Sequence, residues 1–573
     1  MILTEDQRQI LNKHLSFIYP DSDTKQLTEK LLRLMESYAG LQSSNGSLRK
    51  KYYSHKDLFV IAYGDSIKND HQYPLEVLHA FMNEHFSDLI KNLHILPFFP
   101  YSSDDGFSVI DYRKIRDDLG NWNHVTALSK DYRIMADLVI NHVSSQSEYF
   151  REFLLGEGLG SGFFHVVNPS ENVRMVTRPR STPLFTPVAT KMGIHHIWTT
   201  FSADQVDVNF GNPDVLFEFL DILLFYLEKG VRVIRLDAVA FLWKKIGTSC
   251  IHLPETHEVV KLIRSIVDIL APDTILITET NVPHKENVSY FGDGDEAHMV
   301  YNFSLPPLLY HAIITQNAAY LSEWSKNLST PPEGCTYFNF AASHDGIGVR
   351  PLEGLVPDEE FNKIINAAIK RGGYVSYKEN GDGTKSPYEL NITYFDAFKD
   401  IKTNDISVQV RKFMCSQMLM LSFRGVPAIY IHSLFGTQND YENVAKTGMA
   451  RSINRRKWQL NDLNERLQDP ENHHVSVFNS WKKLLRIRIQ EAAFDPQGGK
   501  KVLDSPPELF VMWRNAPQNS EQIIVLGNVT EKEISWNVPD DYDITNGIDL
   551  ISGEAVRSTK VQLEPWQVRW IKF

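Results

Sequence analysis

Short hydrophobic runs alternate with amphipathic segments along most of the chain, which is typical of strands that are each followed by a helix. One such helix is predicted in "NPDVLFEFLDILLFYLEKG", with Asn212 as its N-cap, Pro213 at its first position and Gly230 as its stop. The strands are apolar throughout, as strands covered on both faces are. They are predicted at residues 57–65, 89–99, 132–141, 231–237, 274–280, 299–307, 336–345 and 425–433.

Eight strand-then-helix units predict an α/β protein built on a (β/α)8 TIM barrel. A doubly wound open sheet is the alternative, but no GxGxxG turn follows the first strand. Two connections, after the third and the seventh strand, are too long to be simple loops, and short strand-like pieces without helices follow from about residue 495. We therefore predict an N-terminal helical segment with the barrel start (1–144), an inserted B domain (145–202), the barrel middle (203–345), an inserted B′ segment (346–400), the barrel end (401–494) and a C-terminal antiparallel β domain (495–573).

Composition narrows the class of protein. The chain has 573 residues and a net charge of −12, which argues against nucleic acid or an anionic membrane as its main partner. Its cysteines, Cys250, Cys335 and Cys415, form no CxxC pair, which fits a reducing cytoplasm and not a disulfide framework or a cysteine zinc site. No signal peptide and no stretch that could span a bilayer is visible. We therefore expect a cytoplasmic protein.

Charged residues cluster where the predicted strands end. Arg235 and Asp237 end the fourth strand, Glu279 ends the fifth, and His344 with Asp345 ends the seventh. Because the carboxyl ends of barrel strands converge on one face, these side chains are expected to line one pocket. Several carboxylates in one pocket suit glycoside chemistry, in which one attacks the sugar and another protonates the leaving oxygen. Arg235 is expected to keep Asp237 ionised and aimed, as a nucleophile must be.

Each of these residues also has a purely structural interpretation. Arg235 and Asp237 suit an ion pair at a strand end, and Glu279 suits an acidic residue at a helix N-terminus. His142 and His344 suit hydrogen-bonded structural histidines. The catalytic interpretation is favoured because the charges all fall at carboxyl ends of strands in barrel order, which independent structural roles do not require.

Four segments, "ADLVINHVS", "VRVIRLDAV", "ITETNVPH" and "AASHDGIG", resemble the signature segments of the α-amylase superfamily, in the same order. The stretches "HDGIG", "GTSC" and "LPPLLYH" are similar to its sucrose phosphorylase-like branch. Within that branch, "YSSDDGFSVIDY", "TRPRSTPLFTP" and "SPYELNITYFDAF" look most similar to glucosylglycerate phosphorylases. The resemblance runs from about residue 50 to the C-terminus. It implies retaining phosphorolysis of 2-O-α-D-glucosyl-D-glycerate to α-D-glucose 1-phosphate and D-glycerate through a covalent glucosyl-aspartate.

The resemblance also implies roles for single residues. It makes Asp237 the nucleophile, Glu279 the general acid/base and Asp345 the stabiliser of the transition state. Core packing is the structural alternative for each phenylalanine of the apolar platform that it implies. The residues that it places around the glucosyl ring are Asp104, Phe107, His142, Phe201, Arg235, Phe241, His344 and Arg455.

Phosphate requires cations or hydroxyl donors in a pocket that is otherwise rich in carboxylates. The "RPR" loop offers Arg178 and Arg180, and Tyr388 lies in the second long loop. From its residues alone, the RPR loop suits a solvated surface turn as well as an anion site. The resemblance implies that all three side chains contact phosphate.

The acceptor side of the pocket departs from the sucrose-specific pattern. Glu389 and Phe241 stand where sucrose-specific members tend to carry glutamine and tyrosine, so fructose is not the leaving group that we expect. Arg350 and Lys385 in the second loop are further candidates to balance the charge of an acidic acceptor.

Three alternative functions stay open at this point. The first is a sucrose or sucrose 6′-phosphate phosphorylase. The second is a hydrolytic α-glucosidase, which has no need for the RPR loop. The third is a catalytically inactive barrel that serves as a binding subunit, but such a barrel is expected to lose Asp237, Glu279 or Asp345, and all three are present.

No resident metal or cofactor is predicted, and inorganic phosphate is the expected co-substrate. Amylases bind calcium partly through the asparagine of the "NHV" segment, here Asn141, but no acidic cluster completes such a site in the sequence. The expected partners are a small glucoside and phosphate, without nucleic acid or membrane. A homodimer is one of the assembly states that the sequence leaves open.

Overall fold

Eight parallel strands close into a barrel in the computed structural model, which describes residues 3–42, 52–380 and 384–573. The strand order around the barrel is β1-β17-β13-β12-β11-β10-β4-β3. These strands are nearly free of solvent contact, which explains their continuous hydrophobic runs. Their bounds are β1 Phe59–Ala62, β3 Asn92–Ile95, β4 Arg133–Val139, β10 Val231–Asp237, β11 Ile275–Thr278, β12 Met299–Tyr301, β13 Thr336–Phe340 and β17 Val426–Tyr430. The predicted (β/α)8 TIM barrel is confirmed.

Helices cover the barrel on the outside, and their ends follow local sequence rules. In α6 (Pro213–Glu228), the side chain of Asn212 accepts a hydrogen bond from the backbone N–H of Asp214. Gly230 follows with a φ of +97°, a conformation that glycine adopts without strain. The other covering helices are α3 Pro74–Phe86, α4 Trp122–Asp131, α7 Pro254–Leu270, α9 Leu305–Thr315, α10 Ala319–Asn327, α12 Ile406–Ser422 and α16 His473–Arg488.

The connection between β11 and β12 differs from the regular pattern. It holds only the short helix α8 (His284–Asn287) and one 3-10 turn, where the strand-then-helix rule predicted a full helix. Gly292 and Gly294 follow with φ values of +52° and +92°, which a continuing helix does not allow. The fifth unit of the barrel is therefore covered by a loop over part of its length.

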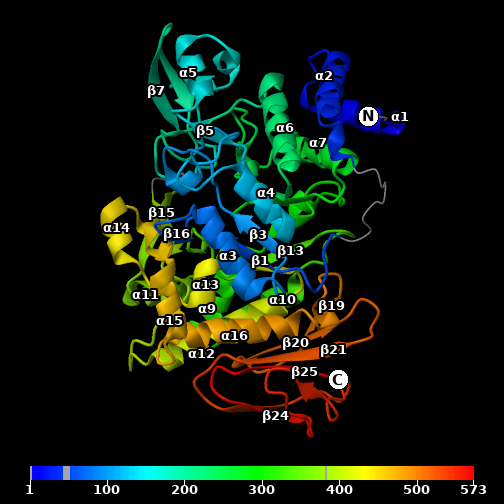
Figure 1. Cartoon of the computed structure of the whole chain (residues 1–573), viewed down its shortest axis with the longest axis vertical. Helices are drawn as coiled ribbons and strands as arrows, with labels where there is room; N and C mark the ends of the chain where they lie inside the picture. Colours follow the sequence, from blue (N-terminus) through cyan, green and yellow to red (C-terminus); the bar gives the residue numbers. More distant parts are fainter. Residues whose placement is uncertain (1–2, 43–51, 381–383) are drawn as a thin grey trace.

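Two insertions rise from the barrel after its third and seventh strands. The first carries β5 (His142–Ser144), α5 (Glu148–Leu155), β6 (Val166–Val167), β7 (Phe185–Thr190), β8 (Gly193–Trp198) and β9 (Gln205–Asp207). The second carries β14 (Ile347–Gly348), α11 (Asp358–Lys370), β15 (Tyr374–Glu379) and β16 (Lys385–Asn391). Figure 1 shows β7 and α5 at the top of the view and the second insertion on its left.

Both ends of the chain pack against this core. Helix α1 (Glu5–Ile18) lies against α7, where His14 Nδ1 is 2.7 Å from Glu258 Oε1. Helix α2 (Thr24–Ser37) follows it. At the other end, antiparallel sheets contain β19 Gly499–Val502, β20 Leu509–Asn515, β21 Gln522–Asn528, β22 Ile534–Asn537, β23 Ile548–Asp549, β24 Lys560–Leu563 and β25 Val568–Lys572. They lie at the bottom of Figure 1, opposite the first insertion.

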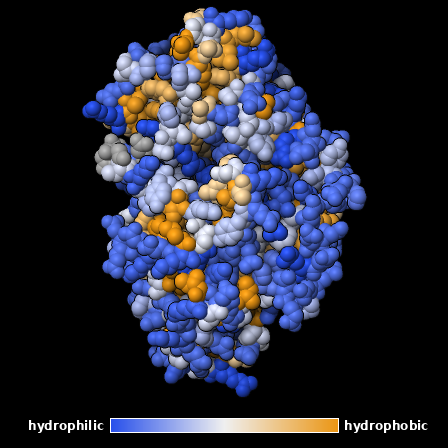
Figure 2. All heavy atoms as spheres, turned by 90° about the vertical axis from the view of Figure 1, so that its left-hand side faces the viewer, coloured by the Kyte–Doolittle hydropathy of each residue, from blue (hydrophilic) through white to orange (hydrophobic). Residues whose placement is uncertain are grey.

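The surface is mostly hydrophilic on the face seen in Figure 2, with separate hydrophobic patches. Some of these patches lie at the end of the molecule that carries the first insertion. The exposed side chains of that insertion include Met192 and Ile194, at 77% and 72% exposure. In the part of the chain that the structure describes, no helix is both long and apolar enough to cross a membrane.

Candidate active site

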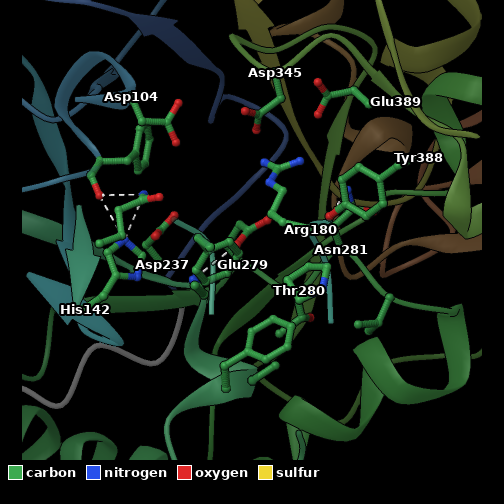
Figure 3. Close-up of a pocket in the computed structure, with 18 of the residues that line it drawn as sticks. Asp104, His142, Arg180, Asp237, Glu279, Thr280, Asn281, Asp345, Tyr388 and Glu389 are labelled. Atoms are coloured by element: carbon green, nitrogen blue, oxygen red, sulfur yellow. Dashed lines mark hydrogen bonds between the residues drawn. The ribbon is translucent and has the colours of Figure 1, made fainter. Parts of the chain in front are cut away.

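A cleft of about 720 Å³ lies at the carboxyl ends of the barrel strands, between the two insertions. Asp237, Glu279 and Asp345 line it together, as the sequence predicted. Figure 3 shows these three carboxylates with residues of both insertions around them. The other predicted residues that line the cleft are Asp104, Phe107, His142, Arg180, Phe201, Arg235, Phe241, His344, Tyr388 and Glu389.

Strand β10 presents Arg235 and Asp237 on the same face, because side chains two residues apart in a strand point the same way. Arg235 Nη1 donates to Asp237 Oδ1 at 2.6 Å and also to Asp137, its register partner on β4. Asp137 in turn contacts His94 on β3, with 2.7 Å between Oδ2 and Nε2. A buried chain of charged and polar groups across three neighbouring strands thus holds Arg235 in place.

The environment of Asp237 raises its pKa, where the sequence predicted that Arg235 would simply keep it ionised. Burial is the largest cause of the rise, and the charges of Arg235 and His142 oppose it. The next residue, Ala238, has a φ of +52°, which is uncommon for a residue with a side chain. In this conformation its backbone N–H donates to Glu279 Oε2 at 3.2 Å. The strained backbone at Ala238 thus links the segment of Asp237 to the carboxylate of Glu279.

Glu279 has the properties of a carboxyl group that is partly protonated near neutral pH. Burial is the largest cause that raises its pKa, to about 7, and the negative charges of Asp237 and Asp345 add to it. Arg235 opposes the rise, with Nη2 at 4.0 Å from Glu279 Oε2. A carboxyl group with this pKa can donate a proton to a leaving group and take one back.

The environment of Asp345 lowers its pKa, in contrast to that of Glu279. Burial acts to raise its pKa, but the positive charges of His344 in its protonated form and of neighbouring arginines outweigh burial and hold the pKa of Asp345 well below the usual value. Burial lowers the pKa of His344 itself to about 3, so that this ring is neutral at neutral pH. Gly346 follows with a φ of +100°, and a Cβ there would lie 2.4 Å from the carbonyl oxygen of Leu390. The glycine therefore lets Asp345 sit close under β16.

Asp104 and Phe107 reach the cleft from a tight turn. Asp104 and Asp105 have φ values of +53° and +48°, and Gly106 has +114°. Aspartate tolerates this region better than most residues, and a Cβ on Gly106 would lie 2.7 Å from the carbonyl oxygen of Pro97. The turn stacks Phe107 on His344, with 4.9 Å between ring centroids and 5° between planes.

Two further aromatic rings and one histidine form another part of the cleft wall. Phe201 meets Phe241 edge to face, with centroids 5.5 Å apart, and contacts His142 at 5.2 Å. His142 Nε2 lies 2.9 Å from the carbonyl oxygen of Phe107. These contacts join the three side chains to the turn that carries Phe107.

The two arginines of the RPR loop take different directions. Arg180 lines the cleft, and its guanidinium lies 5.3 Å from the ring centroid of Tyr388. Figure 3 shows this pair beside Asn281. Arg178 donates to the carbonyl oxygen of Thr182 at 2.7 Å and lines an outer groove, so the structure does not bring it into the cleft.

Three other predicted cations also differ in position. Arg350 lines both the cleft and the outer groove, whereas Lys385 is exposed and lines neither. Arg455 is almost fully buried behind the cleft wall and does not line it. Its Nη1 is 2.6 Å from Asp105 Oδ2, and its Nε donates to the carbonyl oxygen of His344 at 2.9 Å. The structure therefore gives Arg455 no direct path to a ligand in the cleft.

Comparisons with known proteins agree with this geometry. A family model described as alpha amylase, catalytic domain, matches residues 89–347. A glucosylglycerate phosphorylase of Spirochaeta thermophila is 44% identical over 97% of both chains. A glucosylglycerate phosphorylase of Escherichia coli is 40% identical over 99% of this chain and 100% of its own. The chain belongs to the family of these two enzymes, within the α-amylase superfamily.

A solved structure agrees at the level of the fold. The sucrose 6F-phosphate phosphorylase of Thermoanaerobacter thermosaccharolyticum superimposes with a TM-score of 0.73. The match covers 89% of this chain and 98% of the other, at 23% identity.

Two charged residues of this family member's site were not predicted from its sequence. Arg451 lines the cleft and contacts Asp345 and Glu389, but its segment "GMARS" has no strand or helix pattern that would have drawn attention to it. Lys244, three residues after Phe241, donates a hydrogen bond to the carbonyl oxygen of Phe241, which lines the cleft. It gave no signal in the sequence, because lysine is ordinarily an exposed residue.

The ammonium group of Lys244 is buried among oxygens. It lies 2.6 Å from each of three of them, namely Asn141 Oδ1, Asp207 Oδ2 and the carbonyl oxygen of Phe241. Asn141 is the asparagine of the "NHV" segment, through which amylases bind calcium. Lys244 thus places a positive charge among these three oxygens.

The prediction that no metal is bound gains a physical argument from this lysine and stays a prediction. Among residues 3–42, 52–380 and 384–573, no cluster of three or more histidine, cysteine or acidic side chains is arranged to hold a metal ion. If no step depends on a bound cation, as we predict, activity after exhaustive chelation should stay within about twofold of that of the untreated enzyme. A loss of activity that calcium specifically restores would contradict this expectation.

Proposed function

We propose that the protein is a retaining phosphorylase that converts 2-O-α-D-glucosyl-D-glycerate and phosphate to α-D-glucose 1-phosphate and D-glycerate. Relatives with the name glucosylglycerate phosphorylase, 44% and 40% identical over nearly the whole chain, support this proposal. The cleft supports it as well, because it combines a carboxylate triad with cations from both insertions.

In the first step, a carboxylate oxygen of Asp237 attacks C1 of the glucosyl group, and the bond between C1 and the glycerate oxygen breaks. Glu279 donates its proton to that oxygen, which a pKa of about 7 allows at neutral pH. Asp345 is ionised and accepts hydrogen bonds from sugar hydroxyls next to the reacting carbon. The products of this step are D-glycerate and a glucosyl ester on Asp237.

In the second step, a phosphate oxygen attacks C1 from the side that glycerate has left, and the ester bond to Asp237 breaks. Glu279 recovers a proton from the phosphate or from solvent. Two inversions at C1 give net retention, so that the product is the α-anomer of glucose 1-phosphate. The carboxylate of Asp237 is restored for the next cycle.

One observation carries the choice of phosphate over water. Arg180 and Arg350 line the cleft beside Tyr388, and neither forms an ion pair with an acidic residue in the part of the chain that the structure describes. In addition, Arg350 Nε is buried without a hydrogen-bond partner in that part. Unpaired guanidinium groups in a cleft are suited to an anion, since arginine binds phosphate and carboxylate at two points.

Arg180 and Arg350 also favour an acidic acceptor. Glycerate carries a carboxylate that they can bind, whereas neutral fructose leaves them without a partner, and unpaired polar groups reject a ligand strongly. From α-glucose 1-phosphate, we expect glycerate to be glucosylated at least about tenfold more efficiently than fructose, or ~1.4 kcal/mol in the transition state. Initial rates over a range of acceptor concentrations measure this ratio.

A matched variant separates the acceptor site from the catalytic groups. Arg180→Lys keeps the charge but loses two-point binding, so we expect it to weaken both phosphorolysis and the use of glycerate. Arg411→Gln, on the exposed face of α12, is the control and should match the wild type. If fructose or fructose 6-phosphate is the better acceptor of the wild type, the proposed substrate is wrong, although the barrel and its carboxylates stand.

The remaining expectations are also proposals. All three cysteines are free and buried, which supports a place in the cytoplasm. We propose that phosphate is the only co-substrate and that no organic cofactor, nucleic acid or membrane takes part. The homodimer stays a prediction.

A further inference from the structure

Arg451 contacts three carboxylates in the cleft at once. It lies in the 3-10 turn Ala450–Asn454, after the last barrel strand, and its side chain is 15% exposed. Its Nε and Nη2 donate to the two oxygens of Glu389, at 2.9 Å and 2.7 Å. Its Nη1 lies 3.0 Å from Asp345 Oδ1 and 3.7 Å from Asp104 Oδ1.

These carboxylates come from separate parts of the fold. Asp104 follows β3, Asp345 follows β13, and Glu389 lies on β16 of the second insertion. The guanidinium of Arg451 therefore joins the second insertion, whose strand β16 carries Tyr388, to Asp104 and Asp345 on the barrel. Glu389 is only 1% exposed, so without Arg451 it would be a buried charge without a partner.

The shortest contacts of the neighbouring cations with Asp345 are made to one oxygen. Besides Arg451, His344 Nε2 lies 3.4 Å and Arg455 Nη2 lies 3.8 Å from Oδ1. The shortest approach of each of these three side chains is thus to Oδ1, which favours Oδ2 as the oxygen that meets a ligand.

The charge around Asp345 is balanced by groups from several elements. Burial acts to raise its pKa, and His344, Arg451, Arg455 and Arg235 lower it, in that order. Glu279 is the acidic group whose own pKa the charge of Asp345 raises. Arg451 therefore makes the largest contribution of any arginine to keeping Asp345 ionised.

We propose that Arg451 is a positioning residue, which holds the carboxylate of Asp345 by one oxygen and directs the other to the sugar, and that Glu389 is the counter-ion that holds Arg451. The inference rests on the proposed function, in which Asp345 stabilises the transition state. It also explains the glutamate at position 389, because a glutamine there offers one acceptor oxygen in place of two and carries no charge.

This arrangement has a consequence for the acceptor. Arg451 is neutralised by its three carboxylates, so it offers no free charge to phosphate or glycerate. The anion is therefore left to Arg180 and Arg350, which have no such partners in the described ranges. Glu389 lines the cleft, but its charge is already paired before an acceptor enters.

The test uses α-glucosyl fluoride as donor and phosphate as acceptor, with kcat/KM measured across pH. Asp237 and Asp345 both act in their ionised forms, and burial already raises the pKa of Asp237. Loss of Arg451 raises the pKa of Asp345 as well, so the acid limb of Arg451→Gln should become steeper than that of the wild type. At neutral pH, kcat/KM should fall at least about 100-fold, as for loss of one preorganised electrostatic contact. Arg451→Lys should keep the acid limb of the wild type, because it keeps the charge, but with a lower rate.

A double variant separates positioning from folding. Arg451→Gln alone leaves Glu389 buried and unpaired, which lowers the melting temperature. Arg451→Gln with Glu389→Gln removes that charge, so stability should recover while the rate and the acid limb do not. Recovery of kcat/KM to within about threefold of the wild type in the double variant would overturn the inference, since the loss in Arg451→Gln would then come from the unpaired Glu389 and not from Asp345.

The failure of this inference is distinguishable from the failure of the proposed function. Wild-type enzyme that makes no α-glucose 1-phosphate from glucosylglycerate contradicts the proposed function, whatever the variants do. A kcat/KM of Arg451→Gln within about threefold of the wild type at neutral pH contradicts the inference, even if the wild type is a glucosylglycerate phosphorylase.

Discussion

Asp237→Asn should abolish glucosyl transfer in both directions, to below about 1% of the wild-type rate, because an amide cannot act as a carboxylate nucleophile. The fold should survive, since asparagine is nearly the same size and Arg235 keeps its contact with Asp137. Rates of phosphorolysis and of glucosyl transfer from α-glucose 1-phosphate measure the loss. Circular dichroism and the melting temperature check the fold.

The control for this variant is Asp6→Asn, on the exposed face of α1, which should keep wild-type rates. Retention of more than a few per cent of activity in Asp237→Asn would remove Asp237 from the nucleophile role. Loss of the folded state would instead show that the pair with Arg235 is needed for stability.

Glu279→Gln should reduce phosphorolysis of glucosylglycerate by about 10³-fold, because the departing glycerate oxygen needs a proton. α-Glucosyl fluoride needs little protonation of its leaving group, so its first step should stay within about tenfold of the wild type. Equal losses for the two donors would exclude Glu279 as the acid.

The pH dependence of the wild type tests the same role. The pKa of Glu279 is raised to about 7, and the first step requires the protonated form. Phosphorolysis of glucosylglycerate should therefore decline as the pH rises through about 7, and this decline should be absent for α-glucosyl fluoride with Glu279→Gln.

The sequence predicted the barrel and the group of carboxylates that lines the cleft because both follow local patterns. Continuous hydrophobic runs mark strands buried on both faces, and the charges of Arg235 and Asp237 at the end of such a run are unusual enough to stand out. The barrel topology then brings the strand ends together, whatever their distance along the chain.

The long loops were harder to predict, because their side chains are placed by tertiary contacts. Arg178 and Arg180 are two residues apart, but one bonds the carbonyl oxygen of Thr182 and the other lies over the ring of Tyr388 from the second insertion. No local pattern distinguishes them. Arg451 was missed for the same reason, since its importance comes from carboxylates on three other segments.

The pKa of Asp237 shows a second property that the sequence alone did not predict. The sequence places Arg235 beside it and predicts an ionised carboxylate, but the degree of burial, which raises the pKa, is a property of the folded cleft. Likewise, the buried ammonium of Lys244 is recognised only when its three oxygen partners are in place.

The proposed mechanism requires that a glucosyl ester form on Asp237 and be transferred to phosphate. The most direct test incubates Glu279→Gln with α-glucosyl fluoride and follows the intact protein by mass spectrometry, with and without phosphate. Without phosphate, one glucosyl group should accumulate on Asp237, because water needs a base to attack. Added phosphate, which is already ionised, should remove that group and release α-glucose 1-phosphate. An adduct on another residue, or release of glucose alone in the presence of phosphate, would contradict this mechanism.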